Sequence, residues 1–331
     1  MHIKVRTSDT KIWNLRDTCA DISYAMSCHQ PITIDLCSEG PDLHSLEIYD
    51  FLLSESQRYQ YDISMITVLT NNLVETDQRI RIEKKVPWHA IKSTLHYDEL
   101  IDKRPVLKHF GLFIGRSTPP RIVISSQMYK KHRDKMIHTN HLDLGNEFYM
   151  ANLSFDDIVH EFGVENLLDV VHYVLHCPIN ANSMQIDKDN KQNAALQMLA
   201  QDRNEFLDKY QDFFVEIVCD TYYTGDIFFP SEKLWRPILL QTPFIFQGAK
   251  GTLKHLHNLG FKTFAPWWNE GYNENEGAWA VKEVLNLIDE LAKLDAVQIR
   301  KMYDSMRDVL AHNRSRFLEL DNHDFLPYLH G

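Results

Sequence analysis

The sequence contains no run of 18 apolar residues, which excludes an ordinary membrane-spanning helix. Its first residues, Met-His-Ile-Lys-Val-Arg-Thr-Ser, have no apolar core like that of a secretory signal peptide, so we expect a cytoplasmic protein. Cysteine is scarce: five residues, an odd number, with no C-x-x-C pair. This pattern predicts reduced thiols and argues against a disulfide framework.

Common cofactor and metal motifs are also absent. There is no G-x-G-x-x-G turn and no Walker lysine loop, which leaves dehydrogenases and P-loop kinases without support. His172 and His176 stand four residues apart, but no third ligand accompanies them. Asp187-Lys-Asp189 has D-x-D spacing but follows no predicted strand. We therefore expect neither a metal nor a bound cofactor.

Charge is unevenly distributed along the chain. The 331 residues carry a net charge of −11, with 44% hydrophobic and 24% charged residues, as in a soluble protein of two domains. Residues 79–135 hold 14 Lys and Arg against 5 Asp and Glu, a balance of +9 that leaves −20 for the rest. Such a segment fits a nucleotide-phosphate site or a nucleic-acid backbone, or a solvated surface whose charges folding disperses.

Apolar runs alternate with stretches of helical spacing, which predicts βα units and mostly parallel sheets. The expected strands are 31–37, 62–70, 109–115, 213–219, 243–247 and 261–264. The expected helices are 43–59, a helix that follows the loop 116–121 and continues to 131, one or two helices in 154–177, and helices at 193–210, 251–259, 276–294 and 297–320. With the polar stretch 180–192 as an interdomain loop, the sequence predicts two Rossmann-like α/β domains with a cleft between them. They span residues 1–178 and 179–320, and 321–331 form a tail.

Residues 226–248 read as a loop, a short helix, a buried strand and a glycine turn. Ser231 is the expected N-cap, and Glu232 and Lys233 follow it at the start of the helix. A helix N-terminus attracts phosphate, and Lys233 and Arg236, one turn apart, add positive charge. The segment therefore suits a phosphate or diphosphate. The alternative is an ordinary helix with a surface ion-pair pattern.

The same segment, Phe-Phe-Pro-Ser-Glu-Lys-Leu-Trp-Arg-Pro-Ile followed by Thr-Pro-Phe-Ile-Phe-Gln-Gly, resembles the donor-binding signature of α1,3-fucosyltransferase-like glycosyltransferases. It is also similar to a glycosyltransferase-like group from phages and marine metagenomes. That group shares the later element Gly-Thr-Leu-Lys-His-Leu-His-Asn-Leu-Gly-Phe-Lys-Thr-Phe, residues 251–264 here. The resemblance covers about residues 213–275.

This resemblance implies a GT-B fold, whose C-terminal domain holds a nucleoside-diphosphate sugar and whose N-terminal domain holds the acceptor. Lys233 would neutralise the donor diphosphate, and Glu232 would hydrogen-bond the ribose or the sugar. Asp220 and Gly248 are assigned to the donor side as well. The sequence departs from the two patterns at Pro237 and Asp220, which leaves the sugar open.

Two further groups are candidates for the site. Arg116 and Arg121 flank a Ser-Thr-Pro-Pro loop after strand 109–115, where they would clamp phosphate oxygens. Alternatively, they cap carbonyls or pair with acids. Glu39 follows strand 31–37 and is the expected general base of an inverting transfer.

The resemblance thus implies a metal-independent glycosyltransferase that moves a sugar from a nucleoside diphosphate to an acceptor hydroxyl. Its partners would be the nucleotide-sugar and an acceptor that is either a glycan or modified DNA. For a phage-type enzyme, the acceptor would be a hydroxymethylated pyrimidine in the host cytoplasm, and the basic segment would follow the phosphates. A module that binds the nucleotide-sugar without turnover is the other alternative.

Overall fold

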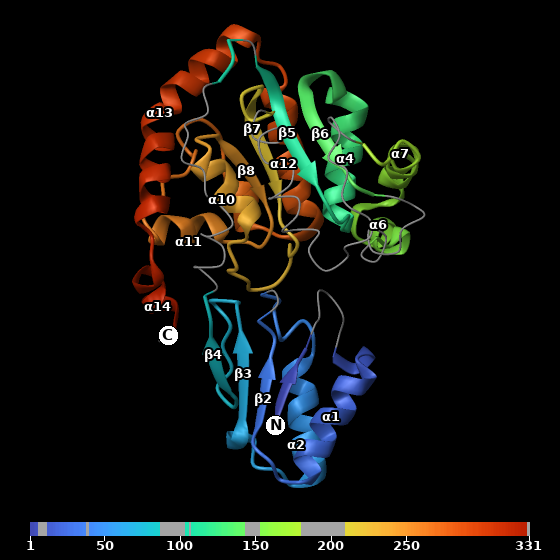
Figure 1. Ribbon diagram of the computed structural model, residues 1–331. Coiled ribbons are helices and arrows are strands. Elements are labelled where there is room, and N and C mark those ends of the chain that lie inside the picture. Colours follow the sequence, from blue (N-terminus) through green and yellow to red (C-terminus); the bar gives the residue numbers. More distant parts are fainter. Residues whose placement is uncertain are drawn as a thin grey trace. The chain divides into compact units, whose positions relative to one another are not determined.

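The computed structural model describes residues 1–5, 12–37, 40–86, 103–105, 107–142, 153–179 and 209–329. It is an α/β structure with two four-stranded parallel sheets (Figure 1). The chain divides into two compact units. Unit 1 comprises Met1–Trp88, Thr224–Phe229 and Asp321–Gly331, and unit 2 comprises His89–Tyr223 and Pro230–Leu320. Within the described ranges, no helix has the length and apolar character needed to cross a bilayer.

Unit 1 is built on the parallel sheet β1-β2-β3-β4. Its strands are β1 (His2–Lys4), β2 (Ile32–Asp35), β3 (Ile66–Thr70) and β4 (Arg81–Lys84). Helix α1 (Arg16–Ser27) connects β1 to β2, and α2 (Ile48–Tyr59) connects β2 to β3. The helix expected from residue 43 begins only at 48, because the Asp42 carboxylate accepts the N–H groups of the next turn.

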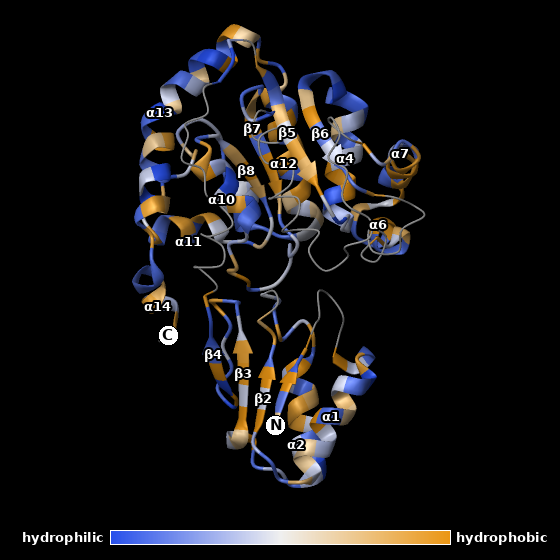
Figure 2. Cartoon of the chain, in the orientation of Figure 1, coloured by the Kyte–Doolittle hydropathy of each residue, from blue (hydrophilic) through white to orange (hydrophobic). Residues whose placement is uncertain are grey.

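A mostly aliphatic core holds unit 1 together. Ile32 and Ile34 of β2 and Val68 of β3 are at most 1% exposed and pack with apolar side chains from α1 and α2. Strand β3 is largely orange in Figure 2, as expected for an inner strand of a sheet covered by helices. The short helix α14 (Leu326–Leu329) also belongs to unit 1, where the Tyr328 ring packs on Phe228.

A buried carboxylate lies in the loop after β3 of unit 1. Glu75 is 3% exposed and accepts hydrogen bonds from the Leu43 N–H, the Tyr49 hydroxyl and the Asn72 amide at 3.0–3.1 Å. The same Asn72 amide donates to the Asp226 carbonyl, and its oxygen accepts the N–H of Phe228. Glu75 therefore orients the asparagine that holds segment 224–229 in this unit.

Burial raises the pKa of Glu75 to about 7, despite the hydrogen bonds that lower it. Because its pKa is higher folded than unfolded, the carboxyl contributes its full stability below pH ~4.5 and loses it as the pH rises through about 7. The free energy of unfolding of Glu75→Gln minus that of the wild type should therefore rise by roughly 1–3 kcal/mol as the pH increases from 5 to 8. Urea unfolding at a series of pH values measures this difference.

Glu83→Gln is the matched control, because Glu83 lies on β4 of the same unit with 42% of its side chain exposed. Its difference from the wild type should stay within about 0.5 kcal/mol across the same pH range. A Glu75→Gln curve parallel to that of the wild type would contradict the assignment of this titration to Glu75.

Unit 2 is built on the parallel sheet β6-β5-β7-β8. Its strands are β5 (Lys108–Ile114), β6 (Met136–Asn140), β7 (Phe213–Cys219) and β8 (Phe244–Gln247). The helices are α4 (Pro119–His132), α6 (Phe155–Phe162), α7 (Val164–Val174), α10 (Glu232–Leu239), α11 (Thr252–Asn258), α12 (Gly277–Leu291) and α13 (Ala296–Glu319). Every residue of β7 is buried, as expected for a central strand covered on both faces.

The sheet of unit 2 is wound in two directions from its middle. From β5 the chain passes through α4 to β6 on one side, and from β7 it passes through α10 to β8 on the other. Helix α4 packs against α12, whereas α10 packs against α13 and β7. Neighbouring strands β5 and β7 therefore form a topological switch point, and in open α/β sheets ligands bind at the carboxyl ends of such strands.

The predicted domain boundary at residue 178 is wrong. Strand β5 pairs with β7, with Lys108 opposite Phe213 and Phe110 opposite Val215, so strands from both sides of that boundary form one sheet. Residues 321–331 are also not a separate tail, because unit 1 includes them. The boundary was misplaced because pairing between strands about a hundred residues apart leaves no local signal in the sequence.

The strand predicted at 261–264 is wrong as well. This segment contains no strand, although Phe261 and Phe264 are buried as the pattern suggested. The Asn313 side chain on α13 accepts from the Lys262 N–H and donates to the Lys262 carbonyl, both at 2.8 Å. One amide side chain thus satisfies the backbone groups that a neighbouring strand would otherwise pair.

Candidate functional site

The switch point of unit 2 is held together by Arg121. This side chain is 2% exposed, and its Nε and Nη2 donate to the Cys219 carbonyl at the end of β7. Nη2 also donates to the Thr221 hydroxyl, and Nη1 donates to the Arg116 carbonyl after β5. One guanidinium therefore joins the loops that follow the two central strands.

This geometry corrects the predicted phosphate clamp. The guanidinium nitrogens of Arg121 all donate to protein oxygens. Arg121 therefore has the second of the two roles considered for Arg116 and Arg121, that of an arginine that caps carbonyls. Arg116 is only half-buried and remains a candidate for the clamp.

Helix α10 starts beside the end of β7. Ser231 occupies the N-cap position, as the sequence predicted, but its side chain does not cap the helix. Its hydroxyl instead donates to Oδ1 of Asp220 at 3.1 Å, and the same oxygen accepts the Thr221 N–H at 2.8 Å. Two predicted site residues, Ser231 and Asp220, are thus brought into direct contact, and the start of α10 is fixed to the switch point.

Lys233 and Glu232 form an ion pair in the first turn of α10. Lys233 Nζ donates to Glu232 Oε1 at 2.8 Å, and the two side chains are 29% and 36% exposed. Burial raises the pKa of the Glu232 carboxyl, but the Lys233 ammonium and hydrogen bonds from Lys233 and its own N–H outweigh this and hold it to about 2. A carboxylate therefore already lies where the helix N-terminus and the lysine attract negative charge.

Asp220 has the opposite perturbation. Burial raises its pKa, and Glu232 adds to the rise, although Lys233, the Thr221 N–H and Arg121 act against it. Two carboxyls near one ammonium thus have pKa values shifted in opposite directions, a pattern that is common at functional sites. Both carboxyls and the ammonium of Lys233 lie at one edge of the sheet.

Gly248 follows β8 and packs directly against Asp220. A Cβ on Gly248 would lie 2.5 Å from the Phe246 ring and 3.0 Å from the Cβ of Asp220. Gly248→Ala should therefore lower the free energy of unfolding by about 1–3 kcal/mol and displace Asp220. Thermal or urea unfolding measures the first effect.

Gly115→Ala is the matched control, because Gly115 follows the neighbouring strand β5 and its Cβ would meet nothing within 4 Å. The control should unfold like the wild type within about 0.5 kcal/mol. Equal stability of the two variants would contradict this prediction, because it would mean that the backbone at Gly248 accommodates a Cβ without a loss of stability.

The structure also corrects the role expected of Arg236. Its side chain is 10% exposed and pairs with the buried carboxylate of Glu216 on β7 and with the hydroxyl of Tyr210. Tyr210 in turn donates to the second oxygen of Glu216 at 2.6 Å, and the Phe113 ring lies 5.5 Å from the guanidinium. These interactions hold the Arg236 guanidinium in the interior, engaged with Glu216 and Tyr210.

Sequence reasoning missed several polar residues at the same edge of the sheet. Thr118 is the N-cap of α4 and makes no capping hydrogen bond, and Asn140 and Gln247 end β6 and β8. Thr118 Oγ1 and Gln247 Oε1 are buried, and neither has a hydrogen-bond partner in the described part of the chain. Buried polar atoms of this kind are rare in folded proteins and are consistent with a bound ligand or water.

Two of these residues could have been identified as site candidates from the sequence. Thr118 lies in the polar loop already singled out after strand 109–115, and Gln247 immediately precedes Gly248. Asn140 carried none, because Met-Ile-His-Thr-Asn does not read as a strand. Glu39, the predicted base, lies outside the described residues.

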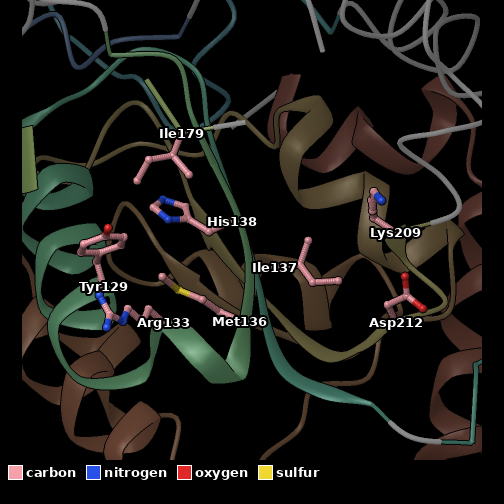
Figure 3. Close-up of a pocket in the computed structure, with 8 residues that line it drawn as sticks. All are labelled: Tyr129, Arg133, Met136, Ile137, His138, Ile179, Lys209 and Asp212. Atoms are coloured by element: carbon pink, nitrogen blue, oxygen red, sulfur yellow. The ribbon is translucent and has the colours of Figure 1, made fainter. Parts of the chain in front are cut away.

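A hollow of about 340 Å³ lies elsewhere in unit 2, along β6 (Figure 3). His138 and Tyr129 line it on one side of the strand, with Lys209 and Asp212 on the other. None of the predicted site residues contributes to its wall. It borders Ile179 and Lys209, where the described chain is interrupted, and we assign it no role in the site.

The basic segment 79–135 contributes residues to both units. Several of its cations pair with acids within 3 Å: Arg79 with Asp77, Arg104 with Asp212, Lys130 with Asp169, and Lys131 with Asp289. Lys103 is buried and donates to two carbonyls and a hydroxyl. Five cations of the segment are therefore engaged with protein groups.

Across the described ranges, no three His, Cys, Asp or Glu side chains are grouped as a metal site would require. Comparisons of the chain with protein-family models, curated proteins and solved structures found no match.

Proposed function

We propose that this protein is a glycosyltransferase of the GT-B type that binds a nucleoside-diphosphate sugar at the carboxyl edge of the unit 2 sheet. One observation supports the proposal above all. The first turn of α10, with Lys233, is fixed to the end of β7 at the switch point through the bond from Ser231 to Asp220. Sequence resemblance assigns this same turn to the donor diphosphate.

The chemistry of sugar transfer requires positive charge at this place. The acceptor oxygen forms a bond to the anomeric carbon, and the bond from that carbon to the diphosphate oxygen breaks. Its electron pair remains on the departing diphosphate, while the hydroxyl proton passes to a base. An ammonium and a helix N-terminus that face the diphosphate stabilise this developing charge.

Glu232 has a defined part in the proposal. In the unliganded protein its carboxylate accepts from Lys233 at 2.8 Å, so an incoming diphosphate competes with it for the ammonium. Once displaced, the carboxylate becomes an acceptor for hydroxyl groups of the ribose or the sugar, the role that the resemblance assigns to it. Asp220 and Gly248 position this turn, and Arg121 holds the loops around it.

For the acceptor, we propose a hydroxyl compound bound by unit 1, with Glu39 kept as a prediction for the base. A glycan is favoured over hydroxymethylated DNA, because several cations of the segment that suggested DNA form ion pairs within their own unit. This choice depends on the described cations alone.

Incubation with a panel of UDP-, GDP- and ADP-sugars tests the proposal, with release of the nucleoside diphosphate and thermal stabilisation as the readouts. We expect one class of nucleotide-sugar to stabilise the protein. The protein should hydrolyse this donor slowly in water and consume it faster when a hydroxyl acceptor is present. Stabilisation without turnover on any acceptor would favour the binding module. No response to any nucleotide would refute the proposed site.

A further inference from the structure

Helix α7 has two apolar faces, and only one of them is buried. Val170, Tyr173 and Val174 are at most 3% exposed, and the helix packs against α4 and α6. A second row of apolar side chains lies on the solvent side: Val164 (65% exposed), Leu168 (79%), Val171 (40%) and Leu175 (70%). We call these four residues the outer stripe. Helix α7 is accordingly largely orange in Figure 2.

Continuous exposed apolar surface is unusual on a monomer and commonly marks a site of association. A lipid surface fits poorly here. Helices that lie on membranes carry Lys and Arg beside their apolar face, whereas α6 and α7 contain neither, and their charges are acidic: Asp156, Asp157, Glu161, Glu165 and Asp169. The same absence of cations disfavours nucleic acid, so the outer stripe fits a protein partner.

The outer stripe is complementary to itself. Its residues are spaced 4, 3 and 4 apart, as in helices that pair side by side, and their order is Val, Leu, Val, Leu. If two such helices pack antiparallel about a twofold axis between Leu168 and Val171, each valine of one copy lies opposite a leucine of the other. Large and small side chains then alternate across the contact, as close packing requires.

The charges beside the stripe fit the same arrangement. Glu165 lies in the first turn of α7, and His172 lies in the last turn on the same flank of the outer stripe. In the antiparallel pair, Glu165 of each copy comes within about one helical turn of His172 of the other. In a parallel pair, the Glu165 side chains of the two copies would lie on opposite flanks of the contact, and neither would face His172 of the other copy. We therefore propose that α7 is the surface through which two copies of this chain associate, with their α7 helices antiparallel.

Sedimentation equilibrium of the full-length chain tests this, over loading concentrations from about 1 to about 100 µM. The wild type should show a reversible monomer–dimer equilibrium in this range. Leu168→Glu should raise the dissociation constant at least about 100-fold, because the charge is buried twice in a symmetric contact. Since Leu168 is exposed in the monomer, circular dichroism and thermal unfolding of the variant should match the wild type.

Two controls separate this contact from non-specific adhesion. Leu318→Glu changes a leucine that is 51% exposed on α13 and should leave the dimer intact. Glu165→Lys and His172→Glu should each weaken the dimer. The double variant should regain most of the wild-type affinity, because the lysine at position 165 of each copy then faces the glutamate at position 172 of the other. A monomeric wild type at the highest concentration, or a Leu168→Glu protein that dimerises as well as the wild type, would overturn the proposal.

Discussion

Lys233→Ala is expected to abolish nucleotide-dependent stabilisation and to lower kcat/KM for sugar transfer by at least about 100-fold, while the fold survives. The ammonium of Lys233 is the positive group in the first turn of α10, and 29% of its side chain is exposed. Without it, the departing diphosphate of the proposed reaction would lie beside two carboxyls, Glu232 and Asp220. The loss therefore exceeds that of one favourable charge, because repulsion from the carboxyls is no longer offset.

The readouts are the thermal shift with the nucleoside diphosphate that stabilises the wild type best, and the rate of donor consumption. Lys254→Ala is the matched control, because Lys254 is an exposed lysine on α11 of the same unit. It should bind and turn over like the wild type. Lys233→Arg keeps the charge with a different shape and should retain part of the binding. Unchanged nucleotide binding in Lys233→Ala would remove Lys233 from the site.

Arg236→Met is expected to cost about 3–5 kcal/mol in free energy of unfolding, the usual penalty for stranding one partner of a buried ion pair. The stranded partner is the Glu216 carboxylate, which is 1% exposed on the central strand β7. Adding Glu216→Gln removes the uncompensated charge, so the double variant should regain a substantial part of the loss.

Urea unfolding measures these differences, with Arg307→Ala as the control. Arg307 pairs with Asp304 on the surface of α13 with 60% of its side chain exposed, so its loss should cost no more than about 0.5 kcal/mol. The experiment also decides between two roles for Arg236. A stable Arg236→Met protein that no longer binds nucleotides would restore the diphosphate role that the sequence suggested and contradict the structural one.

Local patterns predicted much of the fold. Strands rich in β-branched and aromatic residues, such as 213–219 and 243–247, lie where the sequence placed them, with small shifts at their ends. Strands β1, β4 and β6 were missed, because they are short or carry polar residues that break the apolar run. The order β6-β5-β7-β8 could not be foreseen, since it depends on pairing between distant segments.

The candidate site was predicted in the same uneven way. The position of Ser231, Glu232 and Lys233 at the start of a helix was predicted because such a start has a local sequence signature, and the contact of Ser231 with Asp220 follows from the strand–loop–helix order. The arginines were misjudged for a physical reason. A guanidinium serves a ligand or the protein interior according to its burial and partners. Arg121 and Arg236 each have one partner on β7, at Cys219 and Glu216, which lies 98 and 20 residues away in the sequence.

The central claim is that a diphosphate binds at the first turn of α10, beside the end of β7. A crystal structure of the protein with the nucleoside diphosphate that stabilises it most tests this claim directly. We predict diphosphate density within hydrogen-bonding distance of Lys233 Nζ, with the Glu232 carboxylate displaced from its present contact with that atom at 2.8 Å. Nucleotide density at another place, with the pair between Lys233 and Glu232 intact, would contradict the account.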